Sequence, residues 1–254
     1  MTQPAALLRG IAFPLALAVL AQIVWTVAHV QSDTLASPAA ALVAGAHALA
    51  DGSMLAATVQ TLANAFGGLA LGGGLGLVCG IVLGSVAVAD RLMEFSVEAL
   101  RPIPSVALIP VAMLTFGFGF RMEIAIVAFA SFWPVLILTR NAVAGVDPAL
   151  FDVARVLRLT PLARTMKIVL PAALPRIFVA FRLAAGIALT VAVTVEVSTN
   201  PLGLGYGMML AEQSLHPELM LAYLLWIGII GWGLNFAIVG AQQRLFGRSA
   251  QAAR

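Results

Sequence analysis

Six apolar stretches divide the chain, with polar segments between them. They lie at about residues 11–30, 60–88, 103–120, 123–140, 177–198 and 219–240. A helix needs roughly 20 apolar residues to cross the hydrocarbon core of a bilayer. The pattern therefore predicts an all-α integral membrane protein with about six transmembrane helices. The first stretch is longer than the apolar region of a signal peptide, which spans roughly 7 to 15 residues, so we expect it to be a retained helix.

Composition indicates that lipid surrounds most of the chain, and the positions of its charges predict its orientation in the membrane. The chain of 254 residues is 61% hydrophobic and only 10% charged, whereas soluble domains carry about 25% charged residues. With a cytoplasmic N-terminus, every Lys and Arg except Arg121 falls on the cytoplasmic side, where such residues concentrate. We therefore expect both termini inside. The basic residues form no aromatic-basic face, and we expect no nucleic-acid partner.

The second stretch carries a glycine at every fourth position: Gly68, Gly72, Gly76, Gly80 and Gly84. Small residues at this spacing allow membrane helices to approach closely. The stripe predicts packing against a helix of the same chain or, alternatively, a subunit interface.

Prolines mark the start of the third stretch, at Pro102, Pro104 and Pro110. Breaks in the backbone ladder are tolerated in membranes where neighbouring helices or water satisfy the freed groups. One interpretation is a discontinuous helix beside a translocation path, with Pro104 and Pro110 as candidate path residues. The other is a purely structural helix start.

The segment 147–171 is a polar, basic insert between the fourth and fifth stretches. Asp147-Pro148 and Thr160-Pro161 are helix-start signals. They predict two short helices, at about 148–159 and 161–170, the second ended by Pro171. Leu150, Val153, Ala154 and Leu157 recur at helical spacing in the first. This amphipathic hairpin either lies on lipid headgroups or docks a cytoplasmic protein, which the small residues at 153 and 154 would let approach closely.

Polar side chains gather toward the outer end of the fifth stretch. The candidates for a translocation path are Thr190, Thr194, Glu196 and Asn200. An ionisable residue in lipid costs about 2.5 to 3.5 kcal/mol on insertion scales, which makes it a functional candidate. A solvated or helix-packing role for Glu196 is the alternative. Arg182, nearer the inner end, is expected to extend to the headgroups.

Several chemistries are absent from the sequence. A phosphate-binding loop requires Gly-Lys-Ser or Gly-Lys-Thr, and the single lysine, Lys167, lies between Met166 and Ile168. His29, His47 and His216 lack ligand partners at helical spacing, so we expect no metal site. No nucleophile and base are suitably spaced, and we expect no enzyme.

An ion channel is the alternative function. Gly203-Leu204-Gly205-Tyr206-Gly207 lies between the last two of six stretches, as the Thr-Val-Gly-Tyr-Gly filter of potassium channels does. The Thr-Val pair is absent, and about five residues before the first glycine are too few for a pore helix.

The insert also resembles the cytoplasmic-loop motif of ABC importer permeases. In that motif an acidic residue and two small ones are followed by a glycine and, ten residues later, by Ile-x-Leu-Pro. The matching positions here are Asp152, Val153 and Ala154, then Ile168, Leu170 and Pro171, with Asp in place of Glu and Arg158 in place of the glycine. Further segments resemble the branch that imports nitrate, sulfonates and taurine: residues 99–104, 116–119, 170–175 and 203–206. The resemblance covers about residues 55–245.

The resemblance implies a type I importer transmembrane fold in the bacterial cytoplasmic (inner) membrane, with the insert as a coupling-helix hairpin. It implies a second permease chain, two ATP-binding subunits that bind ATP and magnesium, and an extracytoplasmic substrate-binding protein. No cofactor is then expected in this chain, and the substrate is a small anion such as a sulfonate, taurine or nitrate. Domains are expected at 1–54, 55–245 and 246–254. The residues it assigns to ATPase coupling are Asp152, Val153, Ala154, Arg155, Leu157, Arg158, Ile168, Leu170 and Pro171.

Overall fold

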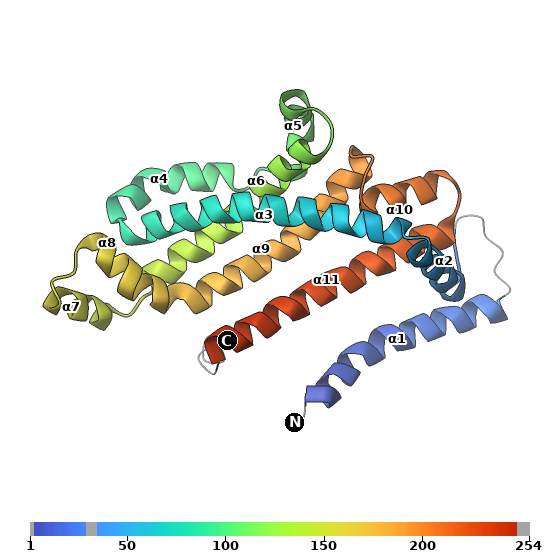
Figure 1. Cartoon of the computed structure of the whole chain (residues 1–254), viewed down its shortest axis with the longest axis horizontal. Coiled ribbons are helices and arrows are strands. Elements are labelled where there is room, and N and C mark those ends of the chain that lie inside the picture. The colour runs from blue at the N-terminus through green and yellow to red at the C-terminus, as the bar shows by residue number, and fades with distance from the viewer. Residues whose placement is uncertain (1–2, 29–34, 248–254) are drawn as a thin grey trace.

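The computed structural model describes residues 3–28 and 35–247, and all regular structure within these ranges is helical (Figure 1). The α-helices are α1 (Gln3–Val27), α2 (Pro38–Ala50), α3 (Ser53–Ser85), α4 (Ala87–Leu100), α5 (Ile109–Phe116), α6 (Phe120–Ala144), α7 (Pro148–Val156), α8 (Pro161–Arg164), α9 (Leu170–Ser198), α10 (Leu204–Gln213) and α11 (Pro217–Phe246). A 3₁₀ turn, η1 (Ser105–Leu108), precedes α5, and a π-helical turn, η2 (Thr165–Val169), joins α8 to α9.

Four helices in the described ranges are long and apolar enough to cross a membrane. They are α3, α6, the continuous helix Pro161–Ser198 and α11, and a fifth crossing results if α4 and η1–α5 are counted as one bent span. The predicted first span, 11–30, lies partly outside the described residues, and its apolar helical stretch, Leu15–Val27, is shorter than a full crossing. The multi-span helical class is confirmed, while the count of six is not.

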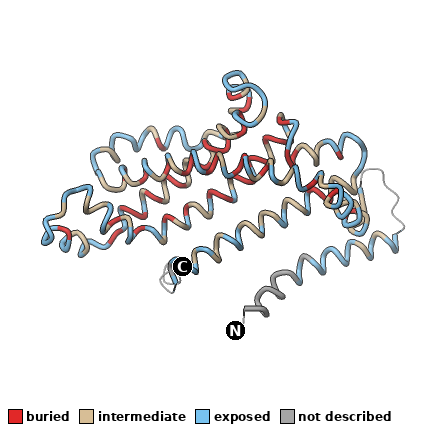
Figure 2. The backbone as a smooth tube through the Cα atoms, viewed as in Figure 1, coloured by how far each residue is buried: buried red, intermediate tan, exposed pale blue. Residues whose placement is uncertain are grey.

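Helices α3, α6 and α9 form the centre of the molecule. They pack against one another, and Figure 2 shows the buried residues gathered along them. Helix α11 packs on α2, α10 and α9, while α1 contacts α2. Figure 1 places α7 and α8 at one end of this bundle and α2 and α10 at the other. The two ends therefore carry different short helices on a shared set of long ones.

The glycine stripe of α3 lies directly against the backbone of α6. A Cβ added at Gly76 would lie 2.6 Å from the carbonyl oxygen of Phe132, and one at Gly80 would lie 2.7 Å from that of Leu136. Gly84 has the same relation to Arg140. No side chain fits between the helices at these positions, because the atoms it would meet are backbone. The prediction of same-chain packing is confirmed.

The predicted third span, 103–120, is wrong as a single helix, because its helical part is only η1 and α5, and residues 117–119 separate α5 from α6. Helix α4 ends at Leu100, and the chain turns by 82° before η1 and α5 continue. Pro102 and Pro104 lie in the turn, and Pro110 lies in the first turn of α5, where its missing N–H leaves no helical bond unmade. A bond of 2.8 Å from Arg140 Nη2 to Asp90 Oδ2 fastens α4 to α6. The discontinuous interpretation therefore describes this backbone.

Pro171 does not end the second hairpin helix, as the sequence predicted it would. The chain remains helical from Pro161 to Ser198 and passes both Pro171 and Pro175. The π-helical turn η2 ends just before Pro171, and such a wider turn relieves the clash between a proline ring and the carbonyl four residues earlier. The fifth span and the hairpin consequently share one helix of 38 residues.

The glycine contact gives a test with an internal control. We expect Gly76→Ala to lower the stability of the detergent-solubilised protein by about 1 to 3 kcal/mol, because the new methyl group overpacks the α3–α6 interface. Gly74, on the same helix, has no atom within 4 Å of an added Cβ, so Gly74→Ala should leave the melting temperature unchanged or slightly raised. Equal melting temperatures for the two variants would contradict this packing.

Candidate functional site

Both helices of the hairpin 147–171 begin where the sequence predicted. The Asp147 carboxylate accepts a bond of 2.9 Å from the backbone N–H of Ala149, and Pro148 follows it. The Thr160 hydroxyl accepts a bond of 3.3 Å from the N–H of Ala163, and Pro161 follows it. Each side chain thus caps backbone donors that the first helical turn leaves free. Helix α7 ends at Val156, somewhat before the predicted boundary near residue 159.

Arg158, at the position where the resemblance expects a glycine, adopts a left-handed backbone conformation. Its φ is +50°. Its N–H bonds the carbonyl of Arg155 at 3.1 Å, and the N–H of Leu159 bonds that of Ala154 at 3.0 Å. This pair of bonds is the Schellman arrangement that closes a helix C-terminus. The helix end is therefore closed with Arg158 in a left-handed conformation, at the steric cost that a side chain incurs in this region.

The face that α7 presents differs from the predicted one. Ala154 is buried, only 3% exposed, whereas Val153 is 50% exposed and Leu157 61% exposed. Leu150 and Phe151 pack against a cluster at the ends of α6 and α9 that includes Val143 and Val146. The prediction that Val153 and Ala154 share one outward, partner-facing surface is wrong, because Ala154 faces its own chain. Val153, Val156 and Leu157 form the exposed apolar edge of α7 instead.

The remaining hairpin residues are divided between surface and core. Asp152 and Arg155 form an exposed ion pair on α7, with 3.0 Å between Arg155 Nη1 and Asp152 Oδ1. Ile168 and Leu170 are half-buried and Pro171 is exposed. Ile168 and Leu170 therefore help to seat the hairpin on the bundle, while Asp152 and Arg155 remain accessible.

Glu196 and Asn200 lie in a buried polar cluster at the opposite end of the bundle. The Glu196 carboxylate accepts bonds of 2.9 Å each from the Thr61 hydroxyl and from the N–H of Gly205. The Thr61 hydroxyl accepts a bond of 2.9 Å from the N–H of Leu204, and the Asn200 amide donates to Glu123. The cluster joins α3, α6, the end of α9 and the start of α10, so the helix-packing interpretation of Glu196 describes these contacts.

The sequence reading missed two members of this cluster, Thr61 and Glu123. Both are fully buried. Glu123 opens an apolar helix, and its cost in lipid was the signal that could have identified it. Thr61 carried no such signal, because a lone threonine in an apolar stretch ordinarily bonds its own helix.

A pocket of about 400 Å³ adjoins the cluster. Its lining combines Glu196 and Asn200 with the more exposed Ser198, Thr199 and Tyr206. The other candidate path residues lie elsewhere. Thr190 and Thr194 bond carbonyls of their own helix, and Pro104 and Pro110 are exposed near the bend. The structure thus brings together two of the six candidates.

The glycine-rich segment after α9 is helical rather than a channel filter. Gly205, Tyr206 and Gly207 lie within α10, so their backbone carbonyls do not form the extended ring of a potassium filter. Gly203 has a φ of +99°, and a side chain there would collide with the Glu196 carboxylate. The segment is a tight entry to α10, and the channel alternative is wrong for this feature.

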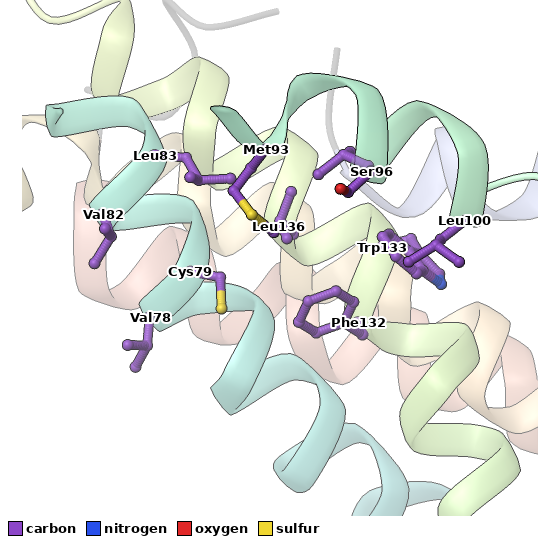
Figure 3. A pocket seen from close by; sticks show the side chains of 11 residues that line it. Val78, Cys79, Val82, Leu83, Met93, Ser96, Leu100, Phe132, Trp133 and Leu136 are labelled. Carbon is purple, nitrogen blue, oxygen red and sulfur yellow. The ribbon is translucent and has the colours of Figure 1, made fainter. Parts of the chain in front are cut away.

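A second pocket, of about 350 Å³, lies between α3, α4 and α6 (Figure 3). Cys79, Met93, Phe132 and Leu136 line it together with further apolar side chains. Its lining is mainly apolar and contains no charged side chain. None of the candidate path residues lines it.

Removing the Thr61 hydroxyl tests the buried polar cluster. We expect Thr61→Val to destabilise the protein by about 1 to 3 kcal/mol, because it leaves the N–H of Leu204 and the Glu196 carboxylate short of a buried partner. Thr115→Val is the control, since that exposed hydroxyl bonds only Val111 of its own helix. Unfolding midpoints in detergent should fall for the first variant alone.

The left-handed residue at the end of α7 makes a separate prediction. We expect Arg158→Gly to stabilise the hairpin by about 1 kcal/mol, because glycine adopts this conformation without a Cβ clash. Leu215 has a φ of +55° at the end of α10, so Leu215→Gly should also stabilise the protein. Hydrogen exchange of the Leu159 amide should slow in Arg158→Gly; an unchanged rate would mean that the conformation carries no strain.

The chain matches known proteins in both sequence and fold. The family model of the binding-protein-dependent transport system inner membrane component matches residues 72–250. A putative aliphatic sulfonates transport permease protein, SsuC of Bacillus subtilis, is 31% identical over 224 residues, which are 88% of this chain and 81% of the relative. The bicarbonate transport system permease protein CmpB of Synechococcus elongatus is 28% identical over 73% of this chain and 67% of the relative.

Among solved structures, a chain from an inward-facing conformation of the MetNI methionine ABC transporter has a TM-score of 0.66 at 21% identity, covering 73% of this chain and 92% of that one. The fold is thus that of a type I importer permease, and the sequence relatives are named as transport permeases. The protein is a multi-pass inner-membrane protein, and it belongs to the family of permeases that serve binding-protein-dependent ABC importers.

Proposed function

We propose that this chain forms the translocation pathway of an ATP-driven importer for a small anion and that the hairpin 147–171 couples it to separate ATPase subunits. The named substrates of its relatives, aliphatic sulfonates and bicarbonate, are anions and support this class. ATP and magnesium would bind the ATPase, a substrate-binding protein would deliver the anion, and a second copy of this chain would complete the pathway. Residues 55–245 would form the core, with 1–54 and 246–254 outside it.

The exposed edge of α7 is the observation that carries the coupling role. Val153, Val156 and Leu157 are 50%, 82% and 61% exposed at one end of the bundle, beside the Asp152–Arg155 ion pair. An apolar edge rimmed by charges is suited to a protein partner. Lipid headgroups are the other possible environment for such a helix.

The continuous helix Pro161–Ser198 provides the mechanical link. At 1.5 Å per residue, its 38 residues span about 57 Å. One end carries the hairpin, and the other carries Glu196 in the cluster that holds α10. A partner that moves the hairpin would therefore tilt or shift α9 as a body and bias the outer cluster between two arrangements.

A charge on the exposed edge tests the coupling role. We expect Leu157→Asp to reduce co-purification of the ATPase from native membranes at least about tenfold, because it buries a carboxylate in the apolar contact. The control is Leu202→Asp, which is 54% exposed at the opposite end and should retain the ATPase. Mass spectrometry of the purified complexes provides the measurement.

The opposing outcomes are distinct. If Leu157→Asp retained a stoichiometric ATPase, the hairpin would not be the docking site. If the wild-type chain purified without an ATPase and passed ions in liposomes without ATP, the importer function itself would be overturned.

A further inference from the structure

Arg182 is a cationic side chain inside a membrane-spanning helix. It lies 12 residues after Leu170 and 16 before Ser198 in α9, about 18 Å and 24 Å from those ends. Ionisable groups in this environment are costly and face the protein interior or a water-filled cavity. The sequence predicted that this side chain extends to the headgroups; in the structure its Nε donates a bond of 2.9 Å to Oδ1 of Asn235 on α11.

The partner of Arg182 is an amide, which holds the guanidinium in place without neutralising it. Within the described ranges, no carboxylate lies within salt-bridge distance of Arg182; the three ion pairs there are Arg140–Asp90, Arg155–Asp152 and His216–Glu218. The only acidic residues of α9 and α11 are Glu196 and Glu218. They are 14 residues from Arg182 and 17 from Asn235, more than about 20 Å along each helix. Among the described residues, the positive charge of Arg182 therefore has no carboxylate partner.

The side chain lines a pocket of about 270 Å³ between α9 and α11. Gly186 and Thr190 follow Arg182 at intervals of four residues, so the three share one face of α9. Gly186 has no atom within 4 Å of an added Cβ, and Gly231 lines the opposite wall. The glycines keep this space open, and Thr190 adds a hydroxyl.

We propose that this pocket binds a single small oxyanion, such as a sulfonate, with its charge paired by Arg182. The bond to Asn235 uses the Nε–H, while the terminal nitrogens of a guanidinium carry the parallel donors that match two oxygens of an oxyanion. An aspartate at 235 would occupy the charge permanently. The Asn235 amide positions the guanidinium without neutralising it, so its charge can pair with an anion that binds reversibly.

The inference deepens the proposed function, since the pocket would be a stopping point for the imported anion, and it rests on that function for its role. The same chemistry would also bind the phosphate of an anionic lipid. The two sources share the prediction that an oxyanion bound between α9 and α11 is lost when the charge of Arg182 is removed or neutralised.

The test is equilibrium binding of ³⁵S-labelled ethanesulfonate to the full chain in nanodiscs of phosphatidylcholine, at constant ionic strength. We expect Arg182→Gln to raise the Kd at least about tenfold, the loss associated with one charge-assisted hydrogen bond. Asn235→Asp should weaken binding similarly while melting at or above the wild-type temperature, because it supplies an internal counterion. Arg176→Gln is the control; that arginine bonds the carbonyl of Gly145 and does not line the pocket.

A second arm identifies the source of the oxyanion. Wild-type and variant chains are purified from membranes containing phosphatidylglycerol, and native mass spectrometry counts the retained lipid. Retention that disappears in Arg182→Gln and Asn235→Asp, without ethanesulfonate binding, would support the oxyanion site with lipid as its occupant. The absence of both ligands from the wild type, or their equal binding to all variants, would overturn the inference.

The outcome is separable from that of the proposed function. ATPase co-purification is measured on the same variants, and Arg182→Gln should retain the partner because the hairpin is untouched. If the wild-type chain retained the ATPase but bound no oxyanion, only the proposal of an oxyanion site at Arg182 would be refuted. Absence of the ATPase from the wild type would refute the importer role whether or not an anion binds.

Discussion

The close contact of α3 with α6 is the constraint on which the rest of the structure depends. Lipid gives helices no hydrophobic reason to associate, so van der Waals contact between backbones must supply much of the attraction. The glycines of α3 place that helix on the carbonyls of α6, and α9 packs against both. The hairpin is seated on one end of α6 and α9, and the polar cluster bridges all three helices at the other end. Both features have fixed positions because the three-helix core does.

Most of the buried polar side chains discussed above bond one another. Thr61, Glu123, Glu196 and Asn200 exchange hydrogen bonds in the interior, and this arrangement is how a low-dielectric environment accommodates groups that would be costly alone. Arg182 also has a neutral partner, the Asn235 amide, but it lines a pocket between α9 and α11 instead of lying in this cluster. The difference separates two carboxylates that neutral donors hold in the core from a cation that a neutral amide holds at the wall of a pocket.

The sequence predicted local features better than directions in space. The capping signals at Asp147 and Thr160, the glycine stripe and the family motif all depend on residues within a few turns of one another, and each was identified. The outward face of α7 was not, because Val153 and Ala154 are neighbours and only the packing of Leu150 and Phe151 on α6 and α9 decides which of them turns inward. The prediction that Pro171 ends a helix was wrong because a π-helical turn lets the helix continue past it. No single residue in the sequence indicates that turn. The prolines before η1 allowed either a discontinuous helix or a simple helix start, because no single residue there shows whether the chain bends.

The continuity of α9 with the hairpin has a thermodynamic consequence. Because one continuous helix reaches both ends, a molecule that favours one position of α9 at the Glu196 end would change the affinity of a partner that binds α7, and the reverse effect would have the same magnitude. Binding at the Glu196 end of the helix and binding at the hairpin would then be linked equilibria rather than successive signals. The helix itself gives the coupling no direction, because each binding event changes the affinity of the other by the same factor.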